Sequence, residues 1–242
     1  MKKFSSNTNA YLKGVEFSNS LVVKHSAAES KIIYRIELLK ALCEGKHIVH
    51  LGFTDHIPLI LAKLNSKNWL HHELTKVASR CMGIDINQEA VEYVKEIIGI
   101  QDVFVHDILS SEKLTELTSV KWDYLLIGEV LEHVDNPVFF LQSIREKYKG
   151  CFSKIIITVP NALELTNIRG VFKHNEIINS DHRFWFTPYT LAKVANAAGF
   201  SIVSYCFSQS FKPDSAFGRF LLRQFPMLRE GIIMIIEDEI ES

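Results

Sequence analysis

The sequence alternates short apolar runs with helical segments, and this alternation limits the possible folds more than any other feature. The runs are apolar throughout rather than at every second position, which is typical of strands buried on both faces of a sheet. They occupy residues 47–51, 80–85, 102–107, 122–128 and 154–159. Helices are expected between them at 57–78, 88–98, 111–117 and 137–148. This order predicts a parallel sheet covered by helices on both faces.

Further regular segments are expected on either side of this block. A helix is expected at 27–43, where apolar residues recur at helical spacing, and Gly45 ends it. After the five strands, a helix at 188–200 leads to a strand at 201–207. The apolar run at 231–238 is interpreted as a final strand.

The same patterns suggest how the chain is divided. Residues 1–25 are polar and irregular, and we interpret them as an N-terminal arm or lid. Residues 26–242 have the length of a single α/β domain. Within it, the segment 208–230 interleaves phenylalanine with arginine. We interpret that segment as a substrate cover or as the contact of a homodimer, with core packing as the alternative.

The composition is typical of a soluble globular protein, with 47% hydrophobic and 23% charged residues. A net charge of −1 does not favour nucleic acid or an anionic membrane as a partner, although a local basic patch is compatible with it. No apolar run approaches the roughly 20 residues needed to span a bilayer, and the N-terminus lacks the apolar core of a signal peptide. The four cysteines form no CxxC pair, so we expect buried thiols in a cytoplasmic protein.

Polar residues follow the predicted strands at the edge where a parallel sheet binds its ligands. Gly52 follows the first strand and, having no Cβ, allows a ligand to approach the backbone closely. Asp85 follows the second strand and could accept hydrogen bonds from both hydroxyls of a ribose. Asp107 follows the third strand and could accept from the amino group of an adenine. For each aspartate, capping of a turn or helix is the alternative role.

Three segments together resemble class I S-adenosylmethionine-dependent methyltransferases. They are "WDYLLIGEVLEHVDNPVFFL", "IIITVPNA" and "DHRFWFTPYTLAKVANAAGF", and the resemblance runs from about Gly45 to Phe200. It is strongest to the branch that methylates small molecules, sugars and lipid precursors. The resemblance implies a Rossmann-like, doubly wound α/β fold with a mostly parallel seven-stranded sheet, its last strand antiparallel. It also implies S-adenosyl-L-methionine as cofactor and a small-molecule acceptor.

The resemblance also implies the cofactor contacts. The implied residues are Gly52, Phe53 and Thr54 at the methionine end, Asp85 at the ribose, Ile86, Asp107 and Ile108 at the adenine, and Glu129 beside the sulfonium. The first motif departs from the family's pattern of an acid followed by three spaced glycines, because His50 stands at the acid and Gly52 is the only glycine. We expect His50 and Asp55 to compensate, with Asp55 replacing the lost charge.

Two roles are open for His133. As an imidazole, it is our candidate base for a hydroxyl or amine acceptor, with a structural hydrogen bond as the alternative. Glu129, Glu132, His133 and His182 also resemble the metal-binding set of small-RNA 2′-O-methyltransferases and of some quinone-precursor O-methyltransferases. The same letters are common in the superfamily without a metal, so the sequence analysis assigns no metal ligand.

A methyltransferase is one of two functions that the sequence supports. The other is a catalytically silent domain that keeps the fold and binds a partner protein, and the altered first motif favours it. Retention of Asp85, Asp107 and Glu129 favours an active enzyme, because a silent domain has no need of contacts to adenosine. A nicotinamide dehydrogenase is disfavoured, because the first turn lacks GxGxxG.

Overall fold

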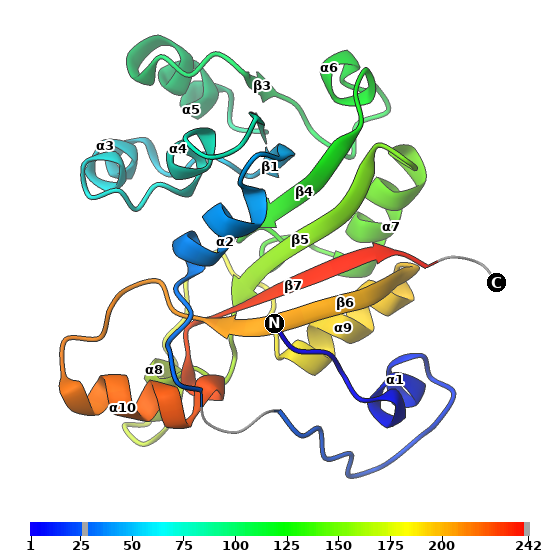
Figure 1. The fold of residues 1–242 in the computed structure, drawn as a ribbon, viewed down its shortest axis with the longest axis vertical. Coiled ribbons are helices and arrows are strands. Elements are labelled where there is room, and N and C mark those ends of the chain that lie inside the picture. Colours follow the sequence, from blue (N-terminus) through cyan, green and yellow to red (C-terminus); the bar gives the residue numbers. More distant parts are fainter. Residues whose placement is uncertain (26–28, 240–242) are drawn as a thin grey trace.

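A seven-stranded sheet forms the centre of the molecule in a computed structural model that describes residues 1–25 and 29–239 (Figure 1). The strand order is β3-β2-β1-β4-β5-β7-β6. The strands are β1 His47–Leu51, β2 Arg80–Asp85, β3 Val103–Val105, β4 Trp122–Gly128, β5 Phe152–Pro160, β6 Phe200–Ser208 and β7 Gly231–Asp238. Strands β1 to β5 pair in parallel, and β7 is antiparallel to both of its neighbours. The predicted sheet is therefore confirmed, including its antiparallel last strand.

Helices cover both faces of this sheet (Figure 1). They are α1 Ser6–Leu12, α2 Arg35–Cys43, α3 Ile57–Asn65, α4 Leu70–Thr75, α5 Gln88–Tyr93, α6 Thr115–Thr118, α7 Pro137–Lys147, α8 Leu165–Val171, α9 Pro188–Ala197 and α10 Ala216–Gln224. A π-helical turn, Val94–Ile98, continues α5, and a 3₁₀ turn, Pro226–Leu228, follows α10.

Successive residues of the central strands face opposite layers of helices. In β4, Leu125 and Ile127 pack into the core that contains α7 and α9. Leu126, between them, packs into the core that contains α2 and α4. Because β4 is apolar on both faces, its sequence shows no alternation of apolar and polar residues, as expected for a central parallel strand.

The helices differ from their predictions more than the strands do. The helix expected at 57–78 is two helices, α3 and α4, separated by a turn in which Lys67 has a φ of +56°. The helix expected at 27–43 begins at Arg35, and residues 26–28 of that prediction lie outside the described residues. Helices α1, α8 and α10 were not predicted, because stretches of seven to nine residues show too little periodicity.

The N-terminal arm packs along β6, the edge strand of the sheet. Lys2 and Tyr205 exchange two backbone hydrogen bonds of 2.7 and 2.8 Å, and Phe4 stacks on the Tyr205 ring. Lys193 of α9 donates to the carbonyl oxygens of Tyr11 and Leu12 at the end of α1. The arm therefore adds to the sheet edge beside α9 (Figure 1).

Within the described ranges, no helix is long and apolar enough to cross a membrane.

Candidate cofactor and acceptor site

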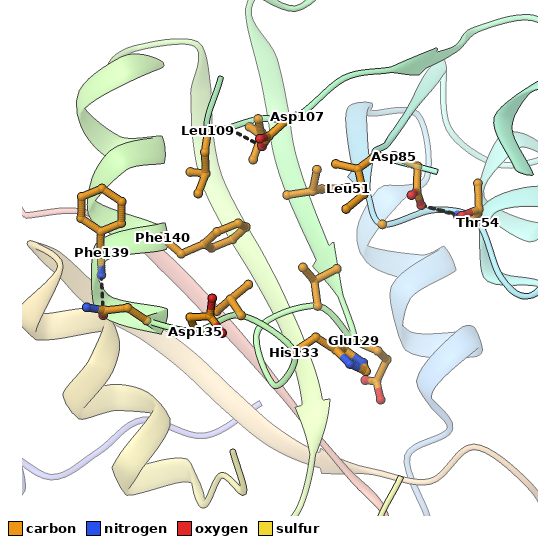
Figure 2. A pocket seen from close by; sticks show the side chains of 16 residues that line it. Leu51, Thr54, Asp85, Asp107, Leu109, Glu129, His133, Asp135, Phe139 and Phe140 are labelled. Carbon is orange, nitrogen blue, oxygen red and sulfur yellow. Dashed lines mark hydrogen bonds between the residues drawn. The ribbon is translucent and has the colours of Figure 1, made fainter. Parts of the chain in front are cut away.

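A cavity of about 670 Å³ lies at the carboxyl ends of β1, β2, β3 and β4. The sheet order reverses between β1 and β4, so the cavity occupies the usual ligand position of a doubly wound sheet. Figure 2 shows Asp85 and Thr54 on one side of the cavity and Phe139 and Phe140 on the other. The lining residues are Leu51, Gly52, Thr54, Asp85, Ile86, Asp107, Ile108, Leu109, Glu129, Val130, His133, Val134, Asp135, Asn136, Phe139 and Phe140. We call it the cofactor cavity, because seven of the residues that were predicted to contact the cofactor line it.

Gly52, the single glycine of the first turn, stands where no other residue fits. Its φ is +69°, in the left-handed region that favours glycine. A Cβ built on it would lie 2.3 Å from Cγ2 of Val130, which follows β4. Its N–H donates to the carbonyl oxygen of Ile84 at 2.9 Å, which holds the turn against β2. Although the other glycines of the family's motif are missing, the cavity beside this turn remains open.

Asp85 and Asp107 each make the turn contacts that were the alternative to ligand binding. Oδ2 of Asp85 accepts from the backbone N–H and the hydroxyl of Thr54 at 3.1 and 2.7 Å, and Oδ1 accepts from Asn87. Oδ1 of Asp107 accepts from the N–H of Leu109 at 2.8 Å. A carboxylate has about four acceptor positions, so these bonds orient both groups without exhausting them. The turn contacts are therefore compatible with the predicted contacts to the cofactor.

A second cavity, of about 520 Å³, adjoins the first across Gly52, Thr54, Asp85, Glu129 and His133, which line both. Arg35, Asn68, Asn179 and His182 add polar side chains to its wall. We call it the polar cavity.

Three predicted cofactor residues line the polar cavity and not the cofactor cavity: His50, Phe53 and Asp55. His50 is buried, and burial, followed by the charge of Arg35, lowers its pKa to about 3, so it is neutral. Phe53 lies in the core beside Trp69, whose indole N–H donates to its carbonyl oxygen. Asp55 forms an ion pair with Lys63. His50 and Asp55 were expected to replace the missing acid. Neither of them lines the cofactor cavity, so neither brings a negative charge to it.

Arg35 lines the polar cavity and was not predicted from the sequence. It is the first residue of α2, and its Nη1 lies 3.0 Å from Oε1 of Glu129. Glu129 has a φ of +56°, an uncommon value outside glycine, and its N–H donates to the carbonyl oxygen of Thr158. The Nε of Arg35 is buried with no partner among the described residues. Nothing local in the sequence reveals this pair, because the two residues lie far apart along the chain.

Phe139 and Phe140 also line the cofactor cavity without having been singled out. They follow Asn136, whose side chain accepts from the N–H of Phe139 and so begins α7. The sequence does contain a signal for this helix, because Asn-Pro before an apolar run marks a helix start, here after the turn that follows β4.

Glu132, His133 and His182 form a cluster in which one potential ligand atom from each residue lies within 4.8 Å of the others. Glu132 is fully buried, and both of its carboxyl oxygens lack a hydrogen-bond partner among the described residues. Burial, followed by the negative charge of Glu129, raises the pKa of Glu132 to about 9. Nδ1 of His133 lies 3.1 Å from the carbonyl oxygen of Asp181. If Nδ1 donates there, the lone pair of Nε2 is free to bind a proton or a metal.

The connection between α8 and α9 brings His182 to this cluster. The N–H of Arg183 donates to the carbonyl oxygen of Glu132 at 2.8 Å. The Arg183 guanidinium bonds the carbonyl oxygen of His133 and pairs with Asp135 at 2.8 Å. The turn after β4 and the distant connection are thus joined by backbone and side-chain contacts. Of the four residues with the metal-site resemblance, three form the cluster, and Glu129 lines the same polar cavity.

Comparison with known proteins identifies the family. The family model described as "Methyltransferase domain" matches residues 66–205, which is more than half of the chain. The chain belongs to the methyltransferase domain family. It is a class I S-adenosylmethionine-dependent methyltransferase, so the family, the enzyme class and the cofactor expected from the sequence are confirmed.

Solved structures show how widely this methyltransferase fold is shared. The small RNA methyltransferase HEN1 aligns with a TM-score of 0.57 at 16% identity, over 92% of this chain and 27% of that one. The present chain thus spans about a quarter of HEN1. Magnesium protoporphyrin IX methyltransferase from Synechocystis PCC 6803, with bound SAH, aligns with a TM-score of 0.52 at 13% identity, over 84% of this chain and 82% of that one.

A putative methyltransferase of Haloferax volcanii, solved in complex with the Trm112 methyltransferase activator, aligns with a TM-score of 0.53 at 15% identity. That alignment covers 84% of this chain and 88% of the other. At these identities the likeness concerns the fold. No curated protein matches the methyltransferase in sequence.

Proposed function

We propose that the enzyme methylates a hydroxyl oxygen of a small-molecule acceptor, with a divalent metal ion held by Glu132, His133 and His182. The observation that carries this proposal is the environment of Glu132. Its carboxyl group is fully buried and unpaired by any described residue, yet it lies beside two imidazoles. Burying an unpaired carboxyl is costly, and binding a cation is a common way to offset that cost.

The cluster fits a metal ion by the chemistry of its donors. A carboxylate with two imidazoles suits Mn²⁺, Zn²⁺ or Fe²⁺ better than Ca²⁺, which prefers oxygen ligands alone. When bound, such an ion lowers the pKa of a hydroxyl group that it contacts. Glu129 lies on the same cavity, at the end of its ion pair with Arg35, and adds negative charge nearby.

We place the adenosine part of the cofactor in the cofactor cavity. Asp85 would accept from the ribose hydroxyls, Asp107 would accept from the adenine amino group, and Ile86 and Ile108 would pack on the ring. The methionine part would reach the junction of the two cavities. The Arg35 guanidinium, which pairs with Glu129 beside that junction, would add positive charge toward the methionine carboxylate.

The acceptor would then occupy the polar cavity, which meets the cofactor cavity at Gly52, Glu129 and His133. S-adenosylmethionine supplies a methyl group that its positive sulfur already activates. The protein must orient the acceptor hydroxyl toward that methyl group and keep water away. In the alternative role of general base, His133 would only remove the proton of the acceptor hydroxyl. A bound metal ion would also explain why Glu132 and His182 lie next to His133.

Metal binding tests this proposal separately from cofactor binding. We expect wild-type enzyme to bind Mn²⁺ in equilibrium dialysis, and Glu132→Gln to weaken that binding by at least about tenfold, because a ligand is lost. Glu96→Gln, which changes an exposed glutamate, is the matched control. All three proteins should bind S-adenosylhomocysteine equally well in calorimetry. Equal Mn²⁺ binding by wild type and Glu132→Gln would refute the assignment of the ligands.

A silent binding domain was the alternative expected from the sequence, and one observation is in its favour. His50 and Asp55 line only the polar cavity, so the first turn brings no acid to the cofactor cavity. The retention of Asp85, Asp107 and an open cavity of about 670 Å³ supports an active enzyme instead. Absence of S-adenosylhomocysteine binding at millimolar concentration would favour the silent domain.

A further inference from the structure

Large apolar side chains are exposed on two segments that are distant in the sequence, 171–178 and 211–225. Phe172 is 82% exposed and Phe217 67% exposed. We call the whole set the aromatic rim: Val171, Phe172, Ile177, Ile178, Phe211, Phe217, Phe220 and Phe225. Scattered exposed apolar residues are normal, but this many on two segments signal an interaction surface if the segments adjoin.

Helix α8, whose last residue Val171 begins the first segment, adjoins the second segment. A cavity of about 450 Å³ is lined by Leu165, Thr166 and Arg169 of α8 together with Gly218 and Leu222 of α10. Figure 1 likewise shows α8 and α10 together at one end of the molecule. The aromatic rim is therefore carried by neighbouring helices and the chain next to them.

Helix α10 turns its phenylalanines outward. Leu222 is its buried residue, whereas Phe217 and Phe220, one turn apart, are exposed. Arg219 is directed back into the protein, since its Nη1 donates to the carbonyl oxygens of Pro213 and Asp214 at 2.8 Å. A helix on the surface of a globular protein normally has the opposite arrangement, with its aromatic face toward the core.

The charge around the aromatic rim differs from that of the whole chain. The segments 165–178 and 211–225 carry five lysine and arginine residues and two acidic residues, in a chain whose net charge is −1. The cations are Arg169, Lys173, Lys212, Arg219 and Arg223, and the acids are Glu176 and Asp214. Phenylalanines beside lysine and arginine are the composition of protein segments that lie in a membrane interface. Anionic lipid headgroups attract such cations.

From this combination we infer that the aromatic rim docks the enzyme on the surface of an anionic lipid bilayer. The phenylalanines enter the boundary between headgroups and acyl chains, and Lys212 and Arg223 lie among the phosphates. Single-stranded RNA fits less well, because Val171, Ile177 and Ile178 cannot stack on bases as aromatic rings do. The contact is peripheral, since α10 has nine residues and cannot span a bilayer.

Flotation of the protein with lipid vesicles tests this inference. We expect wild-type enzyme to float with vesicles of phosphatidylcholine and phosphatidylglycerol, and to float less with phosphatidylcholine alone. Phe217→Gln/Phe220→Gln should weaken binding by about tenfold or more, because two apolar side chains no longer leave water. Lys212→Gln/Arg223→Gln should remove the preference for the anionic vesicles, as should high salt.

The matched control is Phe17→Gln, which removes a phenylalanine that is 84% exposed in the segment after α1. This variant should float as wild type does, and every variant should keep its circular dichroism spectrum and its affinity for S-adenosylhomocysteine. Wild-type protein that stays unbound with both kinds of vesicle would overturn the inference. A dimer in sedimentation velocity that Phe217→Gln/Phe220→Gln dissociates would overturn it too, by assigning the rim to a second copy. So would binding of single-stranded RNA that the same variant abolishes.

Discussion

Glu132 is fully buried, and neither of its carboxyl oxygens has a hydrogen-bond partner among the described residues. A buried carboxyl of this kind normally pairs with a cation or is hydrogen-bonded. Its neighbours His133 and His182 are also common metal ligands; His133 is the next residue in the sequence, whereas His182 comes from the distant connection between α8 and α9. The proposed metal site therefore depends on the approach of His182 to Glu132, a contact that no short motif contains.

Gly52 offers a test of the first turn. Gly52→Ala should lower the affinity for S-adenosylhomocysteine by more than about tenfold, because alanine at a φ of +69° is strained and its Cβ would meet Val130. Gly14→Ala is the control, since Gly14 has a φ of +72° but no atom within 4 Å of the added Cβ. Both variants should lose stability of about 1 kcal/mol from the backbone alone, and only Gly52→Ala should lose affinity. Calorimetry measures the affinities, and equal affinities for the two variants would contradict this account of the turn.

At the scale of elements, the strands were more predictable than the helices or the site. A run such as "HIVHL" or "GIIMIIED" predicts a buried strand from its composition alone, and β1 and β7 have the bounds that were expected. Asp85 and Asp107 were found because the ends of parallel strands meet at one edge. Arg35 and the approach of His182 to Glu132 depend on how α2 and the α8–α9 connection pack, and such packing leaves no periodic signal in the sequence.

Helix α8 provides a prediction about pH. Glu164 precedes the first turn of α8, and burial, followed by Glu230, raises its pKa from 4.5 to about 7. The folded state therefore binds a proton more tightly than the unfolded state does. The resulting stability is complete below pH 4.5 and is lost as the pH rises through about 7.

Thermal unfolding across this pH range checks the prediction. The melting temperature of Glu164→Gln, relative to wild type, should rise between pH 4.5 and 7.5, because glutamine has no proton to lose. Glu176→Gln, which changes an exposed acid in the chain after α8, should follow wild type throughout. Parallel curves for Glu164→Gln and wild type would contradict the assigned cause.

At the scale of the whole molecule, the N-terminal arm and the two cavities lie at different parts of the sheet. The arm pairs with β6 at one edge, whereas both cavities lie at the carboxyl ends of the central strands. In this structure the arm packs on the sheet edge, and none of residues 1–25 lines either cavity.

Deletion of residues 1–12 separates these two roles. The shortened protein should melt at a lower temperature, because it loses the stacking of Phe4 on Tyr205 and the burial of Leu12. Its affinity for S-adenosylhomocysteine should equal that of the full chain in calorimetry. A large loss of affinity, with the fold retained, would instead assign the arm to cofactor binding.

In the proposed site a metal ion lies beside the reactive end of the cofactor. Anomalous X-ray diffraction from crystals grown with Mn²⁺ and S-adenosylhomocysteine can locate such an ion. We expect an anomalous peak bounded by Glu132, His133 and His182, with the adenosine in the cavity lined by Asp85 and Asp107. Clear density for S-adenosylhomocysteine with no anomalous peak at the cluster would contradict it.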